Sequence, residues 1–241
     1  DALVTALGSD YMLRYRHWIE ANRAYVAEKT DGKVGYIYVP DTAVGGRNNI
    51  ARQFTGQMHM DALIIDERWN AGGWSPERFV ELFDRHLGSY WAVREIDEGF
   101  PEPGVGHYGP KCMLINESAG SGGDSFPFWF KERDVGPLIG TRTWGGLVGL
   151  SGNPGLADGG YMSVPRFAFY NKDGTWGIEG HGVDPDIVVV DDPALMVDGG
   201  DPQLDRAIEV MLDEIEKNPY VPVLKPKYPD RSGMGIRPED K

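Results

Sequence analysis

The sequence has 241 residues, of which 41% are hydrophobic and 25% are charged, as in ordinary globular domains. A chain of this length can bury a substantial core. Its formal net charge is -13, from 24 basic and 37 acidic residues, which argues against non-specific binding of nucleic acid. No apolar run approaches the roughly 20 residues that cross a bilayer, and the first residues lack the pattern of a secretory signal. We therefore expect a globular domain without nucleic-acid or membrane partners.

Cysteine and histidine usage limits the chemistry further. The single cysteine, Cys112, excludes an intrachain disulfide and a zinc site made of several cysteines. It lies in the apolar stretch 112–115, which favours a core thiol over a reactive one. No two histidines have the i,i+4 spacing of a helical metal site, so we expect no metal and no other cofactor. A lone cysteine favours the reducing cytoplasm and leaves a secreted or periplasmic location open.

The first half of the chain alternates helical and strand patterns. The predicted elements are a helix over 10–28, a strand over 34–39, a helix around 50–58, a strand over 62–66, and a helix that begins at Ser75-Pro76 and ends at Gly88. The strands are continuous apolar runs, which is typical of strands buried on both faces. This half therefore predicts βαβ units.

The second half continues the alternation and then changes. In order, it contains a Gly/Pro-rich stretch over 99–110, a strand over 112–117, a helix over 122–132, a strand over 137–143, short glycine-separated segments over 147–190, and a helix that opens at Asp201-Pro202. The alternation predicts an α/β fold with a mostly parallel sheet flanked by helices. The segments over 147–190 suggest β-hairpins laid over that core. We divide the chain into a helical lead-in (1–32), a core (33–217) and an extended proline-rich tail (218–241).

Two of the predicted strands open into glycine-rich turns that lead into helices. The first turn, in 64–73, reads Ile-Ile-Asp-Glu-Arg-Trp-Asn-Ala-Gly-Gly, and the second, in 114–124, reads Leu-Ile-Asn-Glu-Ser-Ala-Gly-Ser-Gly-Gly-Asp. Such turns meet at the carboxyl edge of a parallel sheet, where ligands bind. Their free N–H groups favour a phosphate or a developing oxyanion. Neither turn has dinucleotide or Walker spacing, so the oxyanion interpretation is the stronger one.

Acyl transfer needs an exposed nucleophile at such a turn, and Ser121 is placed for it. The backbone N–H groups of Gly122 and Gly72 then form a two-donor oxyanion hole. The alternative, which the pattern alone favours, is that Ser121 only caps the following helix. A serine nucleophile also needs a base. By spacing, His181 on its glycine-flanked loop is the candidate, while the other four histidines fit surface or packing positions.

At these residues the sequence resembles the C-terminal catalytic domain of tricorn proteases, which are relatives of the tail-specific (carboxy-terminal-processing) serine peptidases. The matching segments are 13–16, 35–41, 63–73, 116–124, 139–146, 178–186, 201–204 and 228–235. They cover nearly the whole chain, and the block around Ser121 is specific. The resemblance implies a ClpP/crotonase-like βαβ core and makes Ser121 the favoured nucleophile.

The resemblance also implies roles for the neighbouring residues. The N–H groups of Gly72 and Gly122 form the oxyanion hole, and Glu179 supports the catalytic histidine through an intervening serine. Position 122 is often aspartate in the family and is glycine here, a change that keeps the backbone donor. The tail-specific relatives use a Ser–Lys dyad, with the lysine after a Thr-aromatic-Gly sequence. Gly146 stands at that position here, so the dyad is excluded and a histidine base is favoured.

In tricorn enzymes the catalytic histidine precedes a PDZ domain that itself precedes this region. None of the five histidines here matches it, so we expect a fragment that is nearly inactive alone. The resemblance implies peptide substrates, upstream PDZ and β-propeller domains in the same chain, and a homo-oligomer. A non-catalytic ligand- or peptide-binding module on the same scaffold is the alternative. A lipase-like hydrolase is disfavoured because 119–123 lacks the nucleophile-elbow motif.

Overall fold

The structure is a computed structural model that describes residues 6–151, 154–229 and 238–240. Its helices are α1 (Tyr11–Lys29), α2 (Val44–Gln57), α3 (Pro76–Phe83), α4 (Gly122–Glu132), α5 (Pro193–Met196), α6 (Pro202–Lys217) and the short η1 (Pro238–Asp240). Its strands are β1 (Val34–Tyr38), β2 (Ala62–Asp66), β3 (Ser89–Ala92), β4 (Gly99–Glu102), β5 (Lys111–Ile115), β6 (Leu138–Gly140), β7 (Gly149–Leu150), β8 (Pro165–Phe167) and β9 (Ile187–Val188). None of the helices in the described ranges is both long and apolar enough to cross a bilayer.

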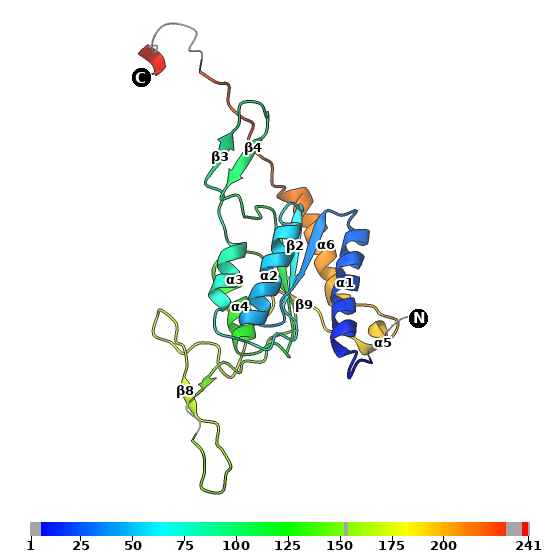
Figure 1. The fold of residues 1–241 in the computed structure, drawn as a ribbon, viewed down its shortest axis with the longest axis vertical. Coiled ribbons are helices and arrows are strands. Elements are labelled where there is room, and N and C mark those ends of the chain that lie inside the picture. The colour runs from blue at the N-terminus through cyan, green and yellow to red at the C-terminus, as the bar shows by residue number, and fades with distance from the viewer. Residues whose placement is uncertain (1–5, 152–153, 230–237, 241) are drawn as a thin grey trace.

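The centre of the molecule is a five-stranded sheet in the order β1-β2-β5-β6-β9, and every pairing is parallel. Strands β1, β2 and β5 are buried along their whole length, as their continuous apolar sequences predict. The expected α/β class, a mostly parallel sheet flanked by helices, is confirmed (Figure 1).

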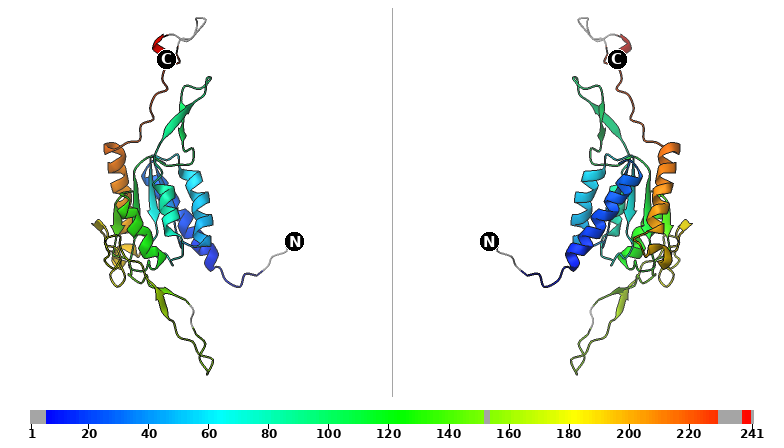
Figure 2. Two further views of the ribbon diagram at one scale, coloured as in Figure 1. Left: turned by 90° about the vertical axis from the view of Figure 1, so that its left-hand side faces the viewer. Right: turned by 90° about the vertical axis from the view of Figure 1, so that its right-hand side faces the viewer.

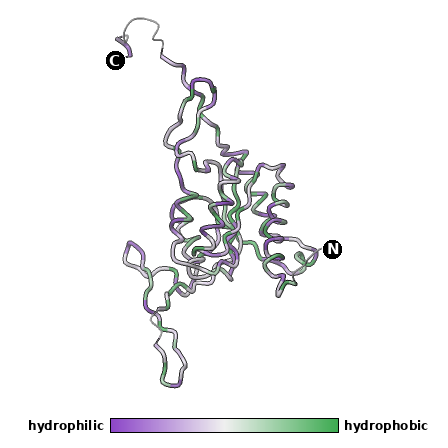
Figure 3. Tube along the Cα trace, viewed as in Figure 1, coloured by the Kyte–Doolittle hydropathy of each residue, from purple (hydrophilic) through white to green (hydrophobic). Residues whose placement is uncertain are grey.

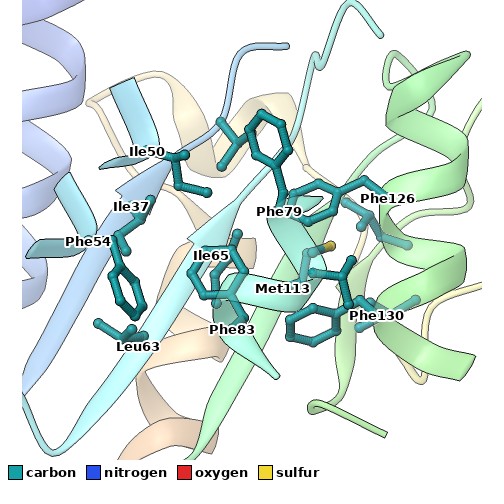
Figure 4. Packing of buried hydrophobic residues seen from close by; sticks show 14 of the residues in the cluster. Ile37, Ile50, Phe54, Leu63, Ile65, Phe79, Phe83, Met113, Phe126 and Phe130 are labelled. Carbon is teal, nitrogen blue, oxygen red and sulfur yellow. The ribbon is translucent and has the colours of Figure 1, made fainter. Parts of the chain in front are cut away.

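Helices cover both faces of this sheet. Alternate strand residues such as Ile37 and Ile65 pack with phenylalanines of α2, α3 and α4 on one face (Figure 4). Their neighbours Tyr36 and Ile64 face α1 and α6 on the other. Period-two alternation along each strand therefore builds two cores from one sheet. Hydropathy follows the same division, with the most apolar segments along the central strands (Figure 3). Cys112 is buried in the second core as a free thiol, as predicted.

Several details differ from the sequence-based expectations. The helix expected to reach Gly88 ends at Phe83, and the Gly/Pro-rich stretch begins with β4, which pairs with β3 in a projecting hairpin. β9 lies within the region expected to form only hairpins, yet it extends the main sheet by pairing with β6. The β3–β4 hairpin and the β7–β8 region extend from opposite ends of the body (Figures 1 and 2). Residues 218–229 run beside β3–β4, where the Tyr90 and Tyr220 hydroxyls lie 2.9 Å apart.

A buried ion network ties the carboxyl edge of the sheet to α6. Arg68 is fully buried, and its Nη2 lies 2.7 Å from Oδ2 of Asp66 and 2.7 Å from Oδ2 of Asp201. The Tyr36 hydroxyl donates to the same Asp66 oxygen at 2.7 Å. The Asp201 carboxylate also accepts the backbone N–H of Leu204 and so caps α6. The network fixes where the chain leaves β2 toward the first glycine-rich turn.

Replacing Arg68 by methionine should therefore destabilise the fold. Arg68→Met leaves the buried Asp66 carboxylate without its counter-charge, and removing one partner of a buried pair costs about 3–5 kcal/mol. Urea denaturation measures the change. The control Arg206→Met breaks only the exposed pair with Glu209 and should cost about 1 kcal/mol or less. Equal losses in the two variants would contradict the assigned importance of the buried network.

Glu67, the residue after β2, is a second buried acid of a different kind. Its side chain is fully buried, and neither carboxyl oxygen has a hydrogen-bond partner among the described residues. Burial, followed by the charges of Asp124 and Asp66, raises the pKa of Glu67 well above its ordinary value. Because burying an unpaired carboxylate is costly, Glu67 is held as the neutral acid.

The proton on Glu67 makes stability depend on pH. The folded chain binds this proton more tightly than the unfolded chain. The contribution of this proton to the unfolding free energy is therefore complete below the ordinary glutamate pKa. It is lost as the pH rises toward the pKa of Glu67 in the folded chain. Glu67→Gln has no such proton, so from about pH 5 to about pH 8 the wild type should lose more unfolding free energy than the variant. Urea denaturation at several pH values tests this. Parallel curves would show that Glu67 is ionised in the fold.

Candidate active site

Ser121 lies where the segment after β5 turns into α4. It is the N-cap residue of that helix and is exposed to solvent. Its backbone has φ 57° and ψ -115°, a conformation that side-chain-bearing residues rarely adopt and that costs about 1–3 kcal/mol. A serine on a strained strand-to-helix turn presents its hydroxyl outward. The two interpretations of Ser121, as a helix cap and as an exposed hydroxyl, are therefore compatible.

The turn is held by a buried carboxylate. The N–H of Ser121 donates to Oδ2 of Asp124 at 2.8 Å and to the carbonyl oxygen of Gly146 at 3.0 Å. The N–H of Gly145 donates to the other Asp124 oxygen at 2.7 Å. Burial raises the pKa of Asp124, and its hydrogen bonds oppose that shift. Asp124 is not among the site residues predicted from the sequence, although an acid three residues after a capping serine is a known signature of a helix start.

The first glycine-rich turn packs directly against Ser121. A Cβ built on Gly72 would lie 2.8 Å from the Ser121 Cβ and 3.1 Å from the Gly122 nitrogen. Gly72 also has φ +84°, so both space and backbone conformation require glycine there. A Cβ on Gly122 would lie 2.6 Å from the Gly73 nitrogen. The structure thus brings together Ser121, Gly72 and Gly122, as the convergence of strand ends predicts.

The amide of Gly72 is not free in this structure. It donates to Oδ1 of Asn70 at 2.8 Å. The amides of Gly73 and Gly122 make no hydrogen bond within the described part of the chain. An oxyanion needs donors that point at it and have no other acceptor. In the present arrangement the unoccupied pair is therefore Gly73 and Gly122.

Asn70 connects the parts of this site. It is fully buried, its Nδ2 donates to the carbonyl of Val39 at 3.0 Å, and its own carbonyl accepts the N–H of Gly120 at 3.1 Å. The Asn70 side chain thus fixes the residue after β1 and the first turn, and the Asn70 main-chain carbonyl fixes the Ser121 turn. This role is not evident from the sequence, because an asparagine before glycines is ordinary turn chemistry.

Glu179 is connected to the Ser121 turn by residues 143–148, a segment that we call the strap. Its Oε2 accepts the N–H groups of Leu147 at 2.6 Å and Val148 at 2.7 Å. The preceding residue, Gly146, supplies the carbonyl that meets Ser121. A mainly apolar cavity of about 330 Å³ opens beside the strap, lined by Leu147, Val148, Ala168, Phe169, Trp176, Gly177 and Glu179.

His181 is occupied elsewhere. Its Nε2 lies 2.6 Å from Oδ2 of Asp184, and both side chains are exposed. No histidine of the described residues hydrogen-bonds to Ser121, and those residues contain no group of three potential metal ligands. His107, which the sequence analysis assigned to the surface or to packing, is buried. Burial lowers its pKa to about 3, which favours the neutral ring.

The chain is similar to known peptidases in both sequence and fold. The family description "Peptidase family S41" matches residues 33–189. The tricorn protease of Thermoplasma volcanium is 41% identical over 90% of this chain, and a tricorn protease homolog of Saccharolobus solfataricus is 41% identical over 88%. The crystal structure of the tricorn protease superposes with a TM-score of 0.83 at 39% identity over 90% of this chain.

This chain corresponds to only about a fifth of the length of these relatives. This chain spans 21% of the Thermoplasma volcanium protein, 20% of the Saccharolobus solfataricus protein and 21% of the chain in the crystal structure. Mature CPAF, at 20% identity and a TM-score of 0.55, shares the fold. Because the family description covers most of the chain and the tricorn proteins are similar along nearly all of it, the chain belongs to peptidase family S41.

Proposed function

We propose that this chain is the serine peptidase domain of a tricorn-like protease and that Ser121 is its nucleophile. The observation that carries the proposal is the exposed, strained Ser121 turn that faces amides without acceptors. The hydroxyl oxygen attacks a peptide carbonyl while a base removes its proton. The tetrahedral oxyanion then collapses, the amine leaves with a proton, and water hydrolyses the acyl-enzyme.

The N–H of Gly122 is the first oxyanion donor in this proposal, since it starts α4 and has no acceptor among the described residues. The second donor expected from the sequence is Gly72. Its bond to Asn70 must break for it to serve, whereas the adjacent Gly73 amide is already unoccupied. Either amide belongs to the turn that packs on Ser121. Losing one such donor typically costs about 3 kcal/mol of transition-state stabilisation.

The base is proposed to be a histidine outside residues 1–241. His181 is paired with Asp184, and no histidine of the described residues hydrogen-bonds to Ser121, which supports this view. Glu179 would support that histidine through a serine. One of its oxygens holds the strap, and no hydrogen bond involves the other within the described residues. On this proposal residues 1–241 alone have little activity.

The substrates are proposed to be short peptides. The cavity beside the strap has aliphatic and aromatic walls, which fit an apolar side chain near the scissile bond. The whole protein would add PDZ and β-propeller domains and form a homo-oligomer, as the resemblance to tricorn proteases implies. The subdivision into a lead-in (1–32), core (33–217) and tail (218–241) is part of the same proposal.

A covalent probe tests the nucleophile. A protein extended upstream of residue 1 should react with a fluorophosphonate at Ser121, because only an activated serine attacks such probes readily. Mass spectrometry of the labelled peptide locates the adduct. Ser121→Ala should abolish both labelling and peptide cleavage, while Ser118→Ala should keep both. Unchanged labelling in Ser121→Ala would end the assignment, and a protein that never labels would favour the binding-module alternative.

The role of His181 is tested separately in the same extended protein. His181→Ala removes only the exposed pair with Asp184, so cleavage should stay within about threefold of the wild type. Steady-state kinetics with a fluorogenic peptide measures it. Loss of a catalytic base costs several orders of magnitude, so a fall of about a thousandfold or more would make His181 the base instead.

A further inference from the structure

The Glu179 carboxylate accepts two short hydrogen bonds from backbone amides. Support of a catalytic histidine does not require these bonds. Oε2 of Glu179 accepts the amides of Leu147 and Val148, at 2.6 and 2.7 Å, and both belong to the strap. Bonds from N–H groups to a carboxylate are about twice as strong as bonds between neutral groups. One carboxylate oxygen thus fixes two successive peptide units.

The strap is attached at its other end to the second carboxylate of the site. Gly145 donates to Asp124, and the Gly145 carbonyl accepts the N–H of Gly180, the residue after Glu179, at 2.8 Å. Thr143 is held by reciprocal bonds with Val183, at 3.1 and 2.9 Å. Between the two carboxylates lies Gly146, where a side chain would not fit, because a Cβ there would lie 2.3 Å from the Trp144 ring.

The strap meets the proposed reaction centre in two places. The Gly146 carbonyl accepts the N–H of Ser121 at 3.0 Å and so helps to hold the positive φ of the nucleophile. The next two residues, Leu147 and Val148, form a wall of the apolar cavity. A shift of the strap therefore changes both the direction of the hydroxyl and the shape of the cavity.

We infer that Glu179 is a positioning residue: its carboxylate holds the strap and thereby couples the apolar cavity to the orientation of Ser121. This inference rests on the proposed function and adds to it, because Glu179 acts here through backbone amides of its own chain. A role in supporting a histidine requires the negative charge. A role in holding the strap requires only an oxygen acceptor at the same place, which glutamine supplies.

The first experiment uses the chain itself and needs no activity. Hydrogen exchange measured by NMR reports the amides of Leu147, Val148 and Ser121 in the wild type, Glu179→Gln and Glu179→Ala. Glu179→Gln should keep their protection within about threefold, whereas Glu179→Ala should lose about tenfold or more at 147 and 148, the equivalent of one hydrogen bond. Asp173→Asn, whose carboxylate bonds only to Thr175, is the matched control and should change nothing there. Unchanged protection in Glu179→Ala would overturn the inference.

The second experiment uses the extended protein and two fluorogenic peptides, with leucine or alanine before the scissile bond. Glu179→Gln should keep the leucine preference within about threefold, because its amide oxygen still holds the strap, while Glu179→Ala should flatten the preference about tenfold. A lower kcat in both variants reports the loss of support for the histidine and leaves the preference as the readout of the strap. If kcat falls equally in both variants and the preference for leucine stays intact, Glu179 acts through its charge alone. That result would overturn the coupling of the cavity to Ser121. If Ser121 itself is not the nucleophile, Ser121→Ala cleaves normally, which separates that failure from this one.

Discussion

The positive φ of Ser121 is the constraint on which the rest of the site depends. A residue with a Cβ holds this conformation only where its surroundings impose it, at a cost of about 1–3 kcal/mol. Here the constraint comes from two segments that follow Ser121 in the chain, α4 and the strap. Asp124 accepts the Ser121 N–H from inside α4, and the Gly146 carbonyl accepts it from the strap. These contacts offset the energy stored in the turn, and one of them requires the strap to pack against it.

Asp124 and Glu67 are two buried acids near this turn, and their surroundings favour different protonation states. Asp124 accepts N–H donors with both oxygens, so its environment is able to stabilise a carboxylate. Glu67 has no donor in the described part of the chain and is influenced by the charge of Asp124. Two like charges in one poorly solvated region cannot both be maintained, so the acid without donors stays protonated. The negative charge is thereby confined to the position where it holds the Ser121 turn.

The sequence predicted the sheet well because its central strands are buried on both faces. Runs such as 62–66 leave no polar alternation that would fit another arrangement. β9 was missed for the opposite reason. It has two residues, and Val188 is 71% exposed, so pairing with β6 defines it rather than its composition. The hairpin β3–β4 was missed because Gly99 and Pro101 lie inside a strand, where both residues are normally depleted.

The meeting of Ser121, Gly72 and Gly122 was also predictable, since parallel strands deliver their carboxyl-end turns to one edge. The state of the Gly72 amide was not, because it depends on the side chain of Asn70, which the pattern describes only as a turn residue. The same limit applies to Glu179. Its position in the sequence indicates an acid near the site, but only the fold shows that its oxygen meets two amides of the strap.

The glycines of the site have a packing cause that is independent of chemistry. A Cβ on Gly123 would lie 2.9 Å from the Asn70 carbonyl, and one on Gly122 would lie 2.1 Å from the Thr42 hydroxyl. The close packing of the two turns in this chain therefore favours glycine at these positions, whether or not the chain is an enzyme. Glycine patterns alone therefore do not separate a peptidase from a binding module on the same scaffold. The distinguishing feature is the combination of the exposed Ser121 with the Gly73 and Gly122 amides, which have no acceptor among the described residues although neighbouring amides are used. Donors of this kind are suited to a ligand that develops negative charge beside Ser121.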